Sequence, residues 1–209
     1  RRRTLLGHPF GKLIPLKIDV TKERDISAAV GTVGQYLIER GNDGHRAVLS
    51  GLVNNAGVQH LSAVEEIDLA RARRLFEVNV WGLVATTQAF LPLMRRAPRG
   101  DADEPGAGQG GRVVNIGSAA GYFPPTLMGV YAASKHSVEA LTDCLRRELH
   151  QFGQHASVIE PGSIHTDIET KMAGQLDAYA AASDDGGASP YAARMAKMAA
   201  SMAAAMGAR

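Results

Sequence analysis

Arg112-Val113-Val114-Asn115-Ile116-Gly117-Ser118 is the stretch that decides the fold. Its apolar run of β-branched residues predicts a short buried strand that ends at Gly117-Ser118. A loop containing Pro124-Pro125 follows, and apolar residues then recur at helical spacing in a long segment that begins near Gly129. The core stripe of that predicted helix consists of Val138, Leu141, Leu145 and Leu149.

The same alternation of strand and helix extends through the rest of the chain. Further strands are predicted at 12–20, 48–54 and 156–160, and helices after Thr21 and over 68–96. Thr21 is the expected N-cap of the first helix, and Ser62 with Glu65 has the spacing of a capping box. The second helix should break near Asn79 to Gly82. This order predicts an α/β fold: a Rossmann-like, doubly wound parallel sheet with helices on both faces.

Polar and small residues follow the predicted strands at their carboxyl ends. Asp19, Asn54, Ser118 and Pro161-Gly162 all occupy such positions. Ligands of open parallel sheets bind outside the carboxyl ends of the strands. The sequence therefore predicts that these residues gather at one edge of the sheet, where a site would form.

Tyr131 and Lys135 begin the helix that follows Ser118. Their spacing of four residues places both side chains on one face of a helix. A lysine cation close to a phenol favours the phenolate, so the pair is a plausible acid/base device. The spacing alone is also compatible with an exposed helix that carries the two residues by chance.

Composition excludes several classes of function. The chain has 209 residues and a net charge of +2, which gives no electrostatic reason to expect nucleic acid as a partner. Cys144 is the single cysteine, which fits a reducing compartment, and we expect a cytoplasmic protein. No apolar run approaches the roughly 20 residues of a membrane span.

The predicted strands and helices and the local composition divide the chain into two expected regions. Residues 1–170 should form a partial Rossmann-fold dinucleotide-binding and catalytic domain. Residues 171–209 are rich in Ala and Met and should form a helical tail or substrate loop. Its methionine stripe either packs or lines a site for an apolar ligand, since methionine adapts its shape; the stripe consists of Met195, Met198, Met202 and Met206.

Four motifs in this order resemble the short-chain dehydrogenase/reductase family. Asn54-Asn55-Ala56-Gly57 resembles its NNAG turn, and Tyr131 to Lys135 resembles its YxxxK motif. Asn79 and Ser118 resemble its active-site asparagine and serine. The likeness covers about residues 12 to 170 and extends to the subgroup of retinol and 17β-hydroxysteroid dehydrogenases.

The resemblance implies an NAD(P)-dependent oxidoreductase that interconverts a secondary alcohol and a ketone or aldehyde. Tyr131 would exchange a proton with the substrate oxygen, Ser118 would hold that oxygen, and Lys135 would assist Tyr131 and bind the nicotinamide ribose. Asn79 would distort its helix and help fix a water connected to Lys135. Hydride passes directly between substrate and cofactor, so the resemblance implies no metal.

The resemblance also implies which residues contact the cofactor. The expected contacts, besides Tyr131 and Lys135, are Asp19, Val20, Asn54, Ala56, Gly57, Pro161, Gly162, Ile164 and Thr166. Asp19 alternatively caps the helix after Thr21. The choice between NAD and NADP is not fixed by these residues, although Arg1 to Arg3 favour the 2′-phosphate of NADP.

The chain departs from the family pattern at both ends. No glycine-rich TGxxxGxG turn is present, and no strand follows the Ala/Met tail, so we expect a sheet that is incomplete at both termini. We expect this chain, expressed alone, to bind dinucleotide weakly or not at all, because that turn holds the pyrophosphate.

Two functions follow as alternatives. The first is an active oxidoreductase on a small apolar alcohol or ketone, retinoid-like or steroid-like, which forms a homo-oligomer through helices 79–96 and 131–151. The second is an inactive family member or fragment that serves as a binding or scaffold protein.

Overall fold

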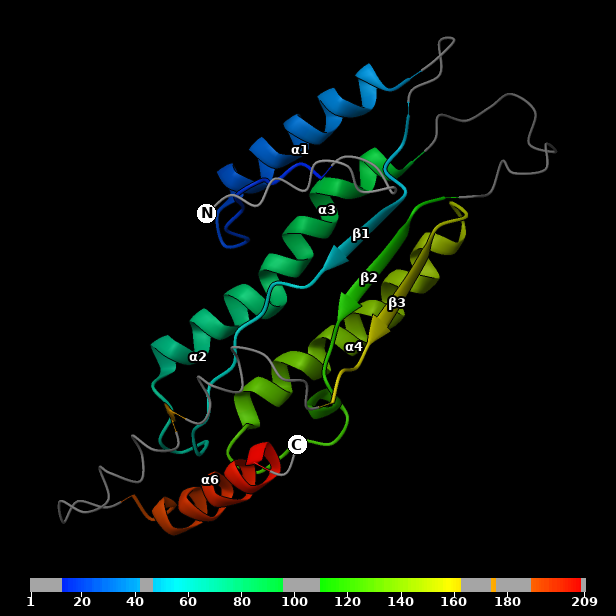
Figure 1. The fold of residues 1–209 in the computed structure, drawn as a ribbon. Coiled ribbons are helices and arrows are strands. Elements are labelled where there is room, and N and C mark those ends of the chain that lie inside the picture. The colour runs from blue at the N-terminus through cyan, green and yellow to red at the C-terminus, as the bar shows by residue number, and fades with distance from the viewer. Residues whose placement is uncertain (1–12, 42–46, 96–109, 163–173, 176–188, 208–209) are drawn as a thin grey trace.

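The computed structural model describes residues 13–41, 47–95, 110–162, 174–175 and 189–207 (Figure 1). Several sequence predictions fall outside these ranges. They concern Arg1 to Arg3, the insertion at 97–109, Ile164 and Thr166, and most of the segment 171–188.

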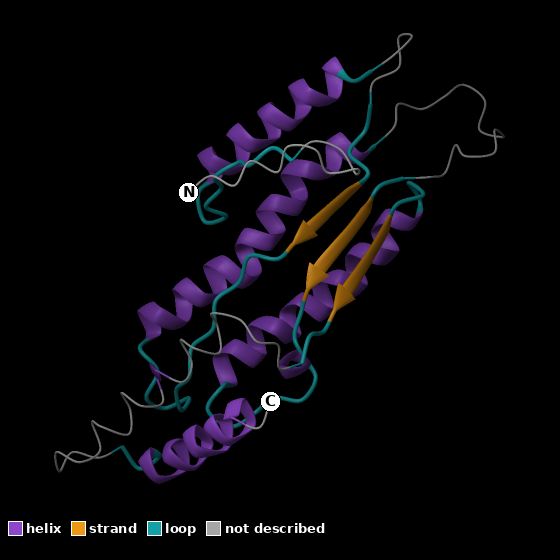
Figure 2. Cartoon of the chain, in the orientation of Figure 1, coloured by secondary structure: helices purple, strands orange, loops and turns teal. Residues whose placement is uncertain are grey.

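Three parallel strands form the sheet, which confirms the predicted α/β fold. The strands are β1 (Gly51–Asn54), β2 (Arg112–Ile116) and β3 (His155–Ile159), hydrogen-bonded in the order β1-β2-β3. The register pairs Asn54 with Asn115 and Ile116 with Ile159. The carboxyl ends of the three strands therefore lie at one edge of the sheet, as their arrowheads show in Figure 2.

The described helices are α1 (Glu23–Glu39), α2 (Leu69–Phe76), α3 (Gly82–Met94), α4 (Gly129–His150) and α6 (Ala192–Gly207), with a π-helical turn η1 (Glu77–Trp81) and a 3₁₀ turn η2 (Ala119–Gly121). Of these helices, α3 and α4 pack on the sheet. Met94 of α3 and Leu149 of α4 pack against Val113 of β2 in one buried cluster. A second cluster joins α1 to α3 through Ile26 and Phe90, so α1 packs chiefly on a helix rather than on the sheet.

The predicted break in the second helix is confirmed. The segment passes from α2 through the π-helical turn η1 into α3, and the N–H of Gly82 donates to the carbonyl of Glu77 five residues earlier. Single π-helical turns inside α-helices are frequent at functional sites. The break changes the direction of the side chains around Asn79 relative to an uninterrupted helix.

The strand predicted at 12–20 is wrong for the part of it that the structure describes. Residues 13–19 have no regular secondary structure and Val20 lies in a turn, without ladder pairing to any described strand, and Leu13 and Ile14 are exposed. The apolar alternation was sufficient for a strand pattern, but a strand also requires a neighbour for its backbone hydrogen bonds. Here the chain instead leads directly into α1.

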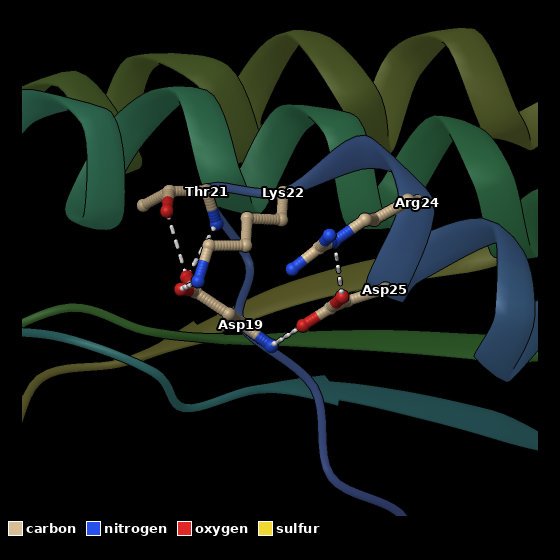
Figure 3. A network of polar contacts seen from close by, with 5 residues as sticks. All are labelled: Asp19, Thr21, Lys22, Arg24 and Asp25. Atoms are coloured by element: carbon tan, nitrogen blue, oxygen red, sulfur yellow. Dashed lines mark hydrogen bonds and ion pairs between the residues drawn. The ribbon is translucent and has the colours of Figure 1, made fainter.

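The two predicted N-caps are also wrong. Thr21 donates its backbone N–H and its hydroxyl to Asp19 Oδ1, and Lys22 occupies the N-cap of α1 (Figure 3). Ser62 donates to the carbonyl of Ala63 and begins no helix. The cap of α2 is Asp68, whose Oδ1 accepts the N–H of Ala70 at 2.9 Å. The hydroxyl of Thr21 is thus engaged by Asp19, and no side chain caps α1, whereas Asp68 caps α2.

The tail helix α6 joins the fold through its methionines. Met195 is fully buried and packs with Leu61, Leu127 and Met128, and Met198 lies against the same cluster. This supports packing as a role of the stripe, while the side chains of Met202 and Met206 lie outside the described set. Among the described helices, α6 included, none is long and apolar enough to cross a membrane.

Gln154 is a buried polar residue whose side chain is not paired. It is 1% exposed, and neither its amide oxygen nor its amide nitrogen has a hydrogen-bond partner among the described residues. Burying such a group costs about 1–3 kcal/mol. Gln154 directly precedes β3, at the opposite end of the strand from the carboxyl ends that are predicted to bind ligand.

Replacing Gln154 by methionine is therefore expected to stabilise the fold by about 1–3 kcal/mol, since methionine fills a similar volume without polar atoms. Urea denaturation of the full-length protein measures the change. Gln35→Met, at an exposed position of α1, is the matched control and should change stability by less than about 0.5 kcal/mol. A lower midpoint for Gln154→Met than for wild type would contradict the assignment.

Candidate active site

Asn79 ties three segments of the chain together. It is 2% exposed and lies in the π-helical turn η1. Its Oδ1 accepts the N–H of Val58, and its Nδ2 donates to the carbonyl of Val58, both at 2.8 Å. Nδ2 also donates to Ser134 Oγ at 3.0 Å, and Ser134 Oγ donates to the carbonyl of Tyr131 at 2.7 Å. Asn79 thus fixes the segment after β1 against the first turns of α4.

Tyr131 and Lys135 lie together on α4. The Lys135 Nζ atom is 5.9 Å from the centroid of the Tyr131 ring. Lys135 is 6% exposed, and its ammonium donates to the carbonyl of Ile116, the last residue of β2, at 2.8 Å. Burial lowers the pKa of Lys135, and the negative charge of Glu139 opposes that shift. The helix therefore delivers a buried cation next to a phenol at the carboxyl end of the sheet.

Ser118 lies at the same edge of the sheet. It follows β2 and caps η2, where its Oγ accepts the N–H of Ala120 at 3.2 Å. The next residue, Ala119, donates its N–H to the carbonyl of Pro161 at 3.0 Å, which joins this loop to the segment after β3. Ser118, Pro161 and the Tyr131–Lys135 pair thus surround one part of the sheet edge.

Glycines provide space at this edge. A Cβ atom on Gly57 would come within 3.5 Å of Asn79 Oδ1 and 3.6 Å of Lys135 Nζ, and one on Gly162 would meet no atom within 4 Å. Gly57 thus presents its backbone directly beside two of the candidate catalytic side chains. A side chain larger than alanine on Gly57 would project toward Lys135.

Asp19 and Val20 are involved in local packing. The Asp19 carboxylate accepts from Thr21 and pairs with Lys22 Nζ at 2.8 Å, and these contacts hold the pKa of Asp19 well below its usual value (Figure 3). Val20 lies against Gly82, where a Cβ would approach its Cγ2 to 2.7 Å. Asp19 therefore holds the turn before α1, but the alternative that it caps this helix is wrong, because the N-cap is Lys22 and no side chain caps the helix. The cofactor contacts of Asp19 and Val20 stay predictions, as does that of the exposed Ala56.

Comparison with known proteins identifies the family of this chain. A family model described as "short chain dehydrogenase" matches residues 5–177. The chain belongs to the short-chain dehydrogenase family. Members of this family use NAD or NADP, and the family assignment covers the whole edge of the sheet described above.

Three curated relatives extend the family assignment to a subgroup. Rat mitochondrial D-beta-hydroxybutyrate dehydrogenase is 38% identical over 152 residues, 73% of this chain and 39% of that protein. Human 17-beta-hydroxysteroid dehydrogenase type 6 is 34% identical over 174 residues, 83% of this chain and 48% of that protein. Rat retinol dehydrogenase 16 is 39% identical over 153 residues, 72% of this chain and 42% of that protein. The predicted resemblance to the retinol and 17β-hydroxysteroid dehydrogenases is confirmed.

A solved structure agrees with the fold of this short-chain dehydrogenase. A short-chain dehydrogenase from Streptomyces avermitilis superposes with a TM-score of 0.58 and 32% identity, over 73% of this chain and 49% of that one. The chain thus spans about half or less of the length of the proteins that it matches.

A buried polar network crosses the short-chain dehydrogenase sheet, and sequence reasoning missed most of it. Asn54 of β1 donates through Nδ2 to Thr87 Oγ1 of α3 at 2.9 Å and to Asn115 Oδ1 of β2 at 2.8 Å. Asn115 Nδ2 donates to Thr142 Oγ1 of α4 at 2.9 Å. The signal available in the sequence was Asn115 itself, a polar amide in an otherwise apolar strand. The network links the turn after β1 to the helix that carries Tyr131.

Glu139 lies near Lys135 and is paired with Glu160. Burial raises the pKa of Glu139, and the hydrogen-bonded neighbour Glu160 raises it further. A Cβ on Gly117 would lie 2.6 Å from Glu139 Oε1, so only glycine leaves room for this side chain at the end of β2. The positive charge of Lys135 therefore has a nearby acidic group on the next turn of α4.

Proposed function

We propose that the full-length protein is an NAD(P)-dependent oxidoreductase that interconverts a secondary alcohol and a ketone or aldehyde. One observation carries the proposal. The buried ammonium of Lys135 lies against the Tyr131 ring, and Asn79 binds the same helix through Ser134. A buried cation beside a phenol at the ligand-binding edge of a parallel sheet suits proton transfer to an oxygen atom.

Each residue at the edge has a distinct role in this proposal. Tyr131 exchanges a proton with the substrate oxygen, and Ser118 donates a hydrogen bond to that oxygen. Lys135 stabilises the ionised form of the phenol. Asn79 positions α4, because its amide is bound to Ser134 and through it to the carbonyl of Tyr131. General acid/base help of this kind contributes typically about 10²–10⁴ in rate.

The residues at the strand ends would hold the cofactor, which when bound supplies or accepts the hydride. Lys135 would bind the nicotinamide ribose. Other proposed contacts are Asp19, Val20, Asn54, Ala56, Gly57, Pro161, Gly162, Ile164 and Thr166. Arg1 to Arg3 favour NADP over NAD in this proposal, since an arginine cluster suits a 2′-phosphate.

The substrate and assembly are further parts of the proposal. The methionine-rich helix α6, which packs through Met195 into the cluster that Tyr131 contacts, supports a substrate with an apolar body. Relatives that act on hydroxysteroids and retinol, by their names, support the same reading. We further propose a homo-oligomer through α3 and α4, and a reducing, cytoplasmic location that suits the exposed thiol of Cys144.

An assay of the full-length protein with secondary alcohols tests the proposal. Purified protein is mixed with each member of a panel of apolar secondary alcohols and either NAD or NADP, and reduced nicotinamide is followed by its absorbance. We expect turnover that depends on one of the two cofactors, with NADP preferred. A full-length protein that binds the cofactor without turning over any alcohol, or any corresponding ketone in the reverse direction, would support the alternative of an inactive binding protein.

A further inference from the structure

A cavity of about 600 Å³ lies between the loop at 125–127 and the first turns of α6. Its apolar lining includes Pro125, Leu127, Pro190 and Met198. The volume falls within the range of about 300–1,000 Å³ that is usual for small-molecule sites. In Figure 1, α6 lies beside the loop that leads into α4, so the cavity is next to the amino end of the helix that carries Tyr131.

Two cations line this apolar cavity. Arg194 and Lys197 are three residues apart on α6, which places them on neighbouring parts of one helix face. Arg194 Nη2 donates to Thr126 Oγ1 at 3.3 Å, which directs the guanidinium across the mouth of the cavity toward the loop. Within the described parts of the chain, neither cation forms an ion pair with a carboxylate.

The acidic residues near the start of α6 have other contacts. Glu66 accepts the hydroxyl of Ser189 at 2.6 Å. Glu65 lies beside the Tyr191 hydroxyl, whose pKa is raised by burial and then by Glu65. The cavity therefore combines an apolar lining with positive charge, which suits a ligand with an apolar body and an anionic group. Arginine binds carboxylate, sulfate or phosphate oxygens in a planar, two-point geometry.

The loop that forms the wall of the cavity has a strained backbone. Leu127 has a φ of 68°, in the left-handed region, and is buried. A non-glycine residue in this region is strained and is retained where the surroundings fix it. Here the carbonyl of Leu127 accepts the N–H of Ser62 at 2.8 Å, and the side chain packs with Leu61 and Met195. The wall of the cavity is thus held in one shape.

The cavity lies next to the apolar cluster that contacts Tyr131. Leu127 and Met198 line the cavity and also belong to the apolar cluster against which the Tyr131 ring packs. We propose that Arg194 and Lys197 bind an anionic group on the substrate, whose apolar body extends from this cavity toward Tyr131. The substrate class is then an apolar alcohol or ketone that carries a carboxylate or another anionic group. The part of this inference that concerns the substrate of the reaction rests on the proposed function, whereas the part that concerns anion binding does not.

Paired substrates test the specificity of the site. A medium-chain keto acid and its methyl ester differ only in charge. In the full-length protein, Arg194→Gln combined with Lys197→Gln should raise the KM of the keto acid about 10- to 100-fold, leave its kcat within about twofold, and leave the KM of the ester unchanged. Arg73→Gln, at an exposed position of α2, is the control and should change neither KM. An unchanged keto-acid KM, or equal losses for acid and ester, would overturn the inference.

A binding experiment separates this inference from the proposed reaction. Octanoate and octyl sulfate are titrated into the full-length protein by calorimetry, with octanol as the neutral probe. We expect at least one anion to bind more tightly than octanol and to lose about tenfold or more in affinity in the double variant. Binding of octanoate alone identifies a carboxylate site, and binding of both anions identifies a general anion site. If neither anion binds more tightly than octanol, the proposed anion site is refuted, even if the protein turns over alcohols. If the anions bind but no alcohol is turned over, the anion site stands and only the proposed reaction is refuted.

Discussion

Replacing Lys135 by methionine in the full-length protein is expected to lower turnover about 100-fold or more without loss of stability. Methionine has a similar length and no charge, so it removes the cation from beside Tyr131 and keeps the volume filled. Among the described residues the buried ammonium donates one hydrogen bond, to the carbonyl of Ile116, and forms no ion pair within 4.0 Å. Replacing a buried charge without a direct ion pair by an apolar side chain is often neutral or stabilising.

The pH dependence of stability gives a second readout for Lys135→Met. Burial lowers the pKa of Lys135 in the folded state below its ordinary value of 10.5. The unfolded chain therefore binds this proton more tightly than the folded chain. The penalty for holding the charged form is fully present at neutral pH and is relieved as the pH rises through the folded-state pKa toward 10.5. Any stability advantage of Lys135→Met over wild type should shrink over that interval.

Steady-state kinetics and thermal unfolding measure both effects on one protein sample. Lys17→Met, at an exposed position before α1, is the control and should change neither turnover nor melting temperature. A variant at position 135 that unfolds at a much lower temperature would indicate that the lysine is structural. A Lys135→Met variant that keeps wild-type turnover would show that Lys135 has no part in the proposed reaction.

The sequence predicted those features of the fold that depend on local pattern. The apolar run at 112–116 became β2 with the expected bounds, because few other structures accommodate such a run. The break around Asn79 and the helix that carries Tyr131 and Lys135 were also predictable, since spacing on a helix face follows from geometry. The family motifs then indicated the edge of the sheet at which these side chains meet.

Features that depend on tertiary partners were not predictable in this way. The segment at 13–20 has the pattern of a strand, but ladder pairing is a property of two segments and not of one. The network from Asn54 to Thr142 requires the register that pairs Asn54 with Asn115. The left-handed conformation of Leu127 depends on its contact with Ser62, and no residue-type preference indicates it.

Replacing Tyr131 by phenylalanine in the full-length protein is expected to lower turnover about 10²- to 10⁴-fold. The change removes one hydroxyl group and keeps the ring that packs against the cluster of Leu61, Leu127 and Met195. The contacts that hold the start of α4 use the backbone carbonyl of Tyr131, which accepts from Ser134, and they persist in the variant. The loss should therefore appear in the chemical step rather than in folding or in cofactor binding.

Turnover of the Tyr131→Phe variant at saturating cofactor and substrate tests the central claim most directly. The account predicts a kcat that is lower by about two to four orders of magnitude, with a cofactor Kd within about threefold of wild type and an unchanged melting temperature. Tyr36→Phe, on α1 and away from the sheet edge, is the matched control and should retain wild-type turnover. A Tyr131→Phe enzyme that turns over almost as fast as wild type would contradict the assignment of Tyr131 as the proton-transfer residue.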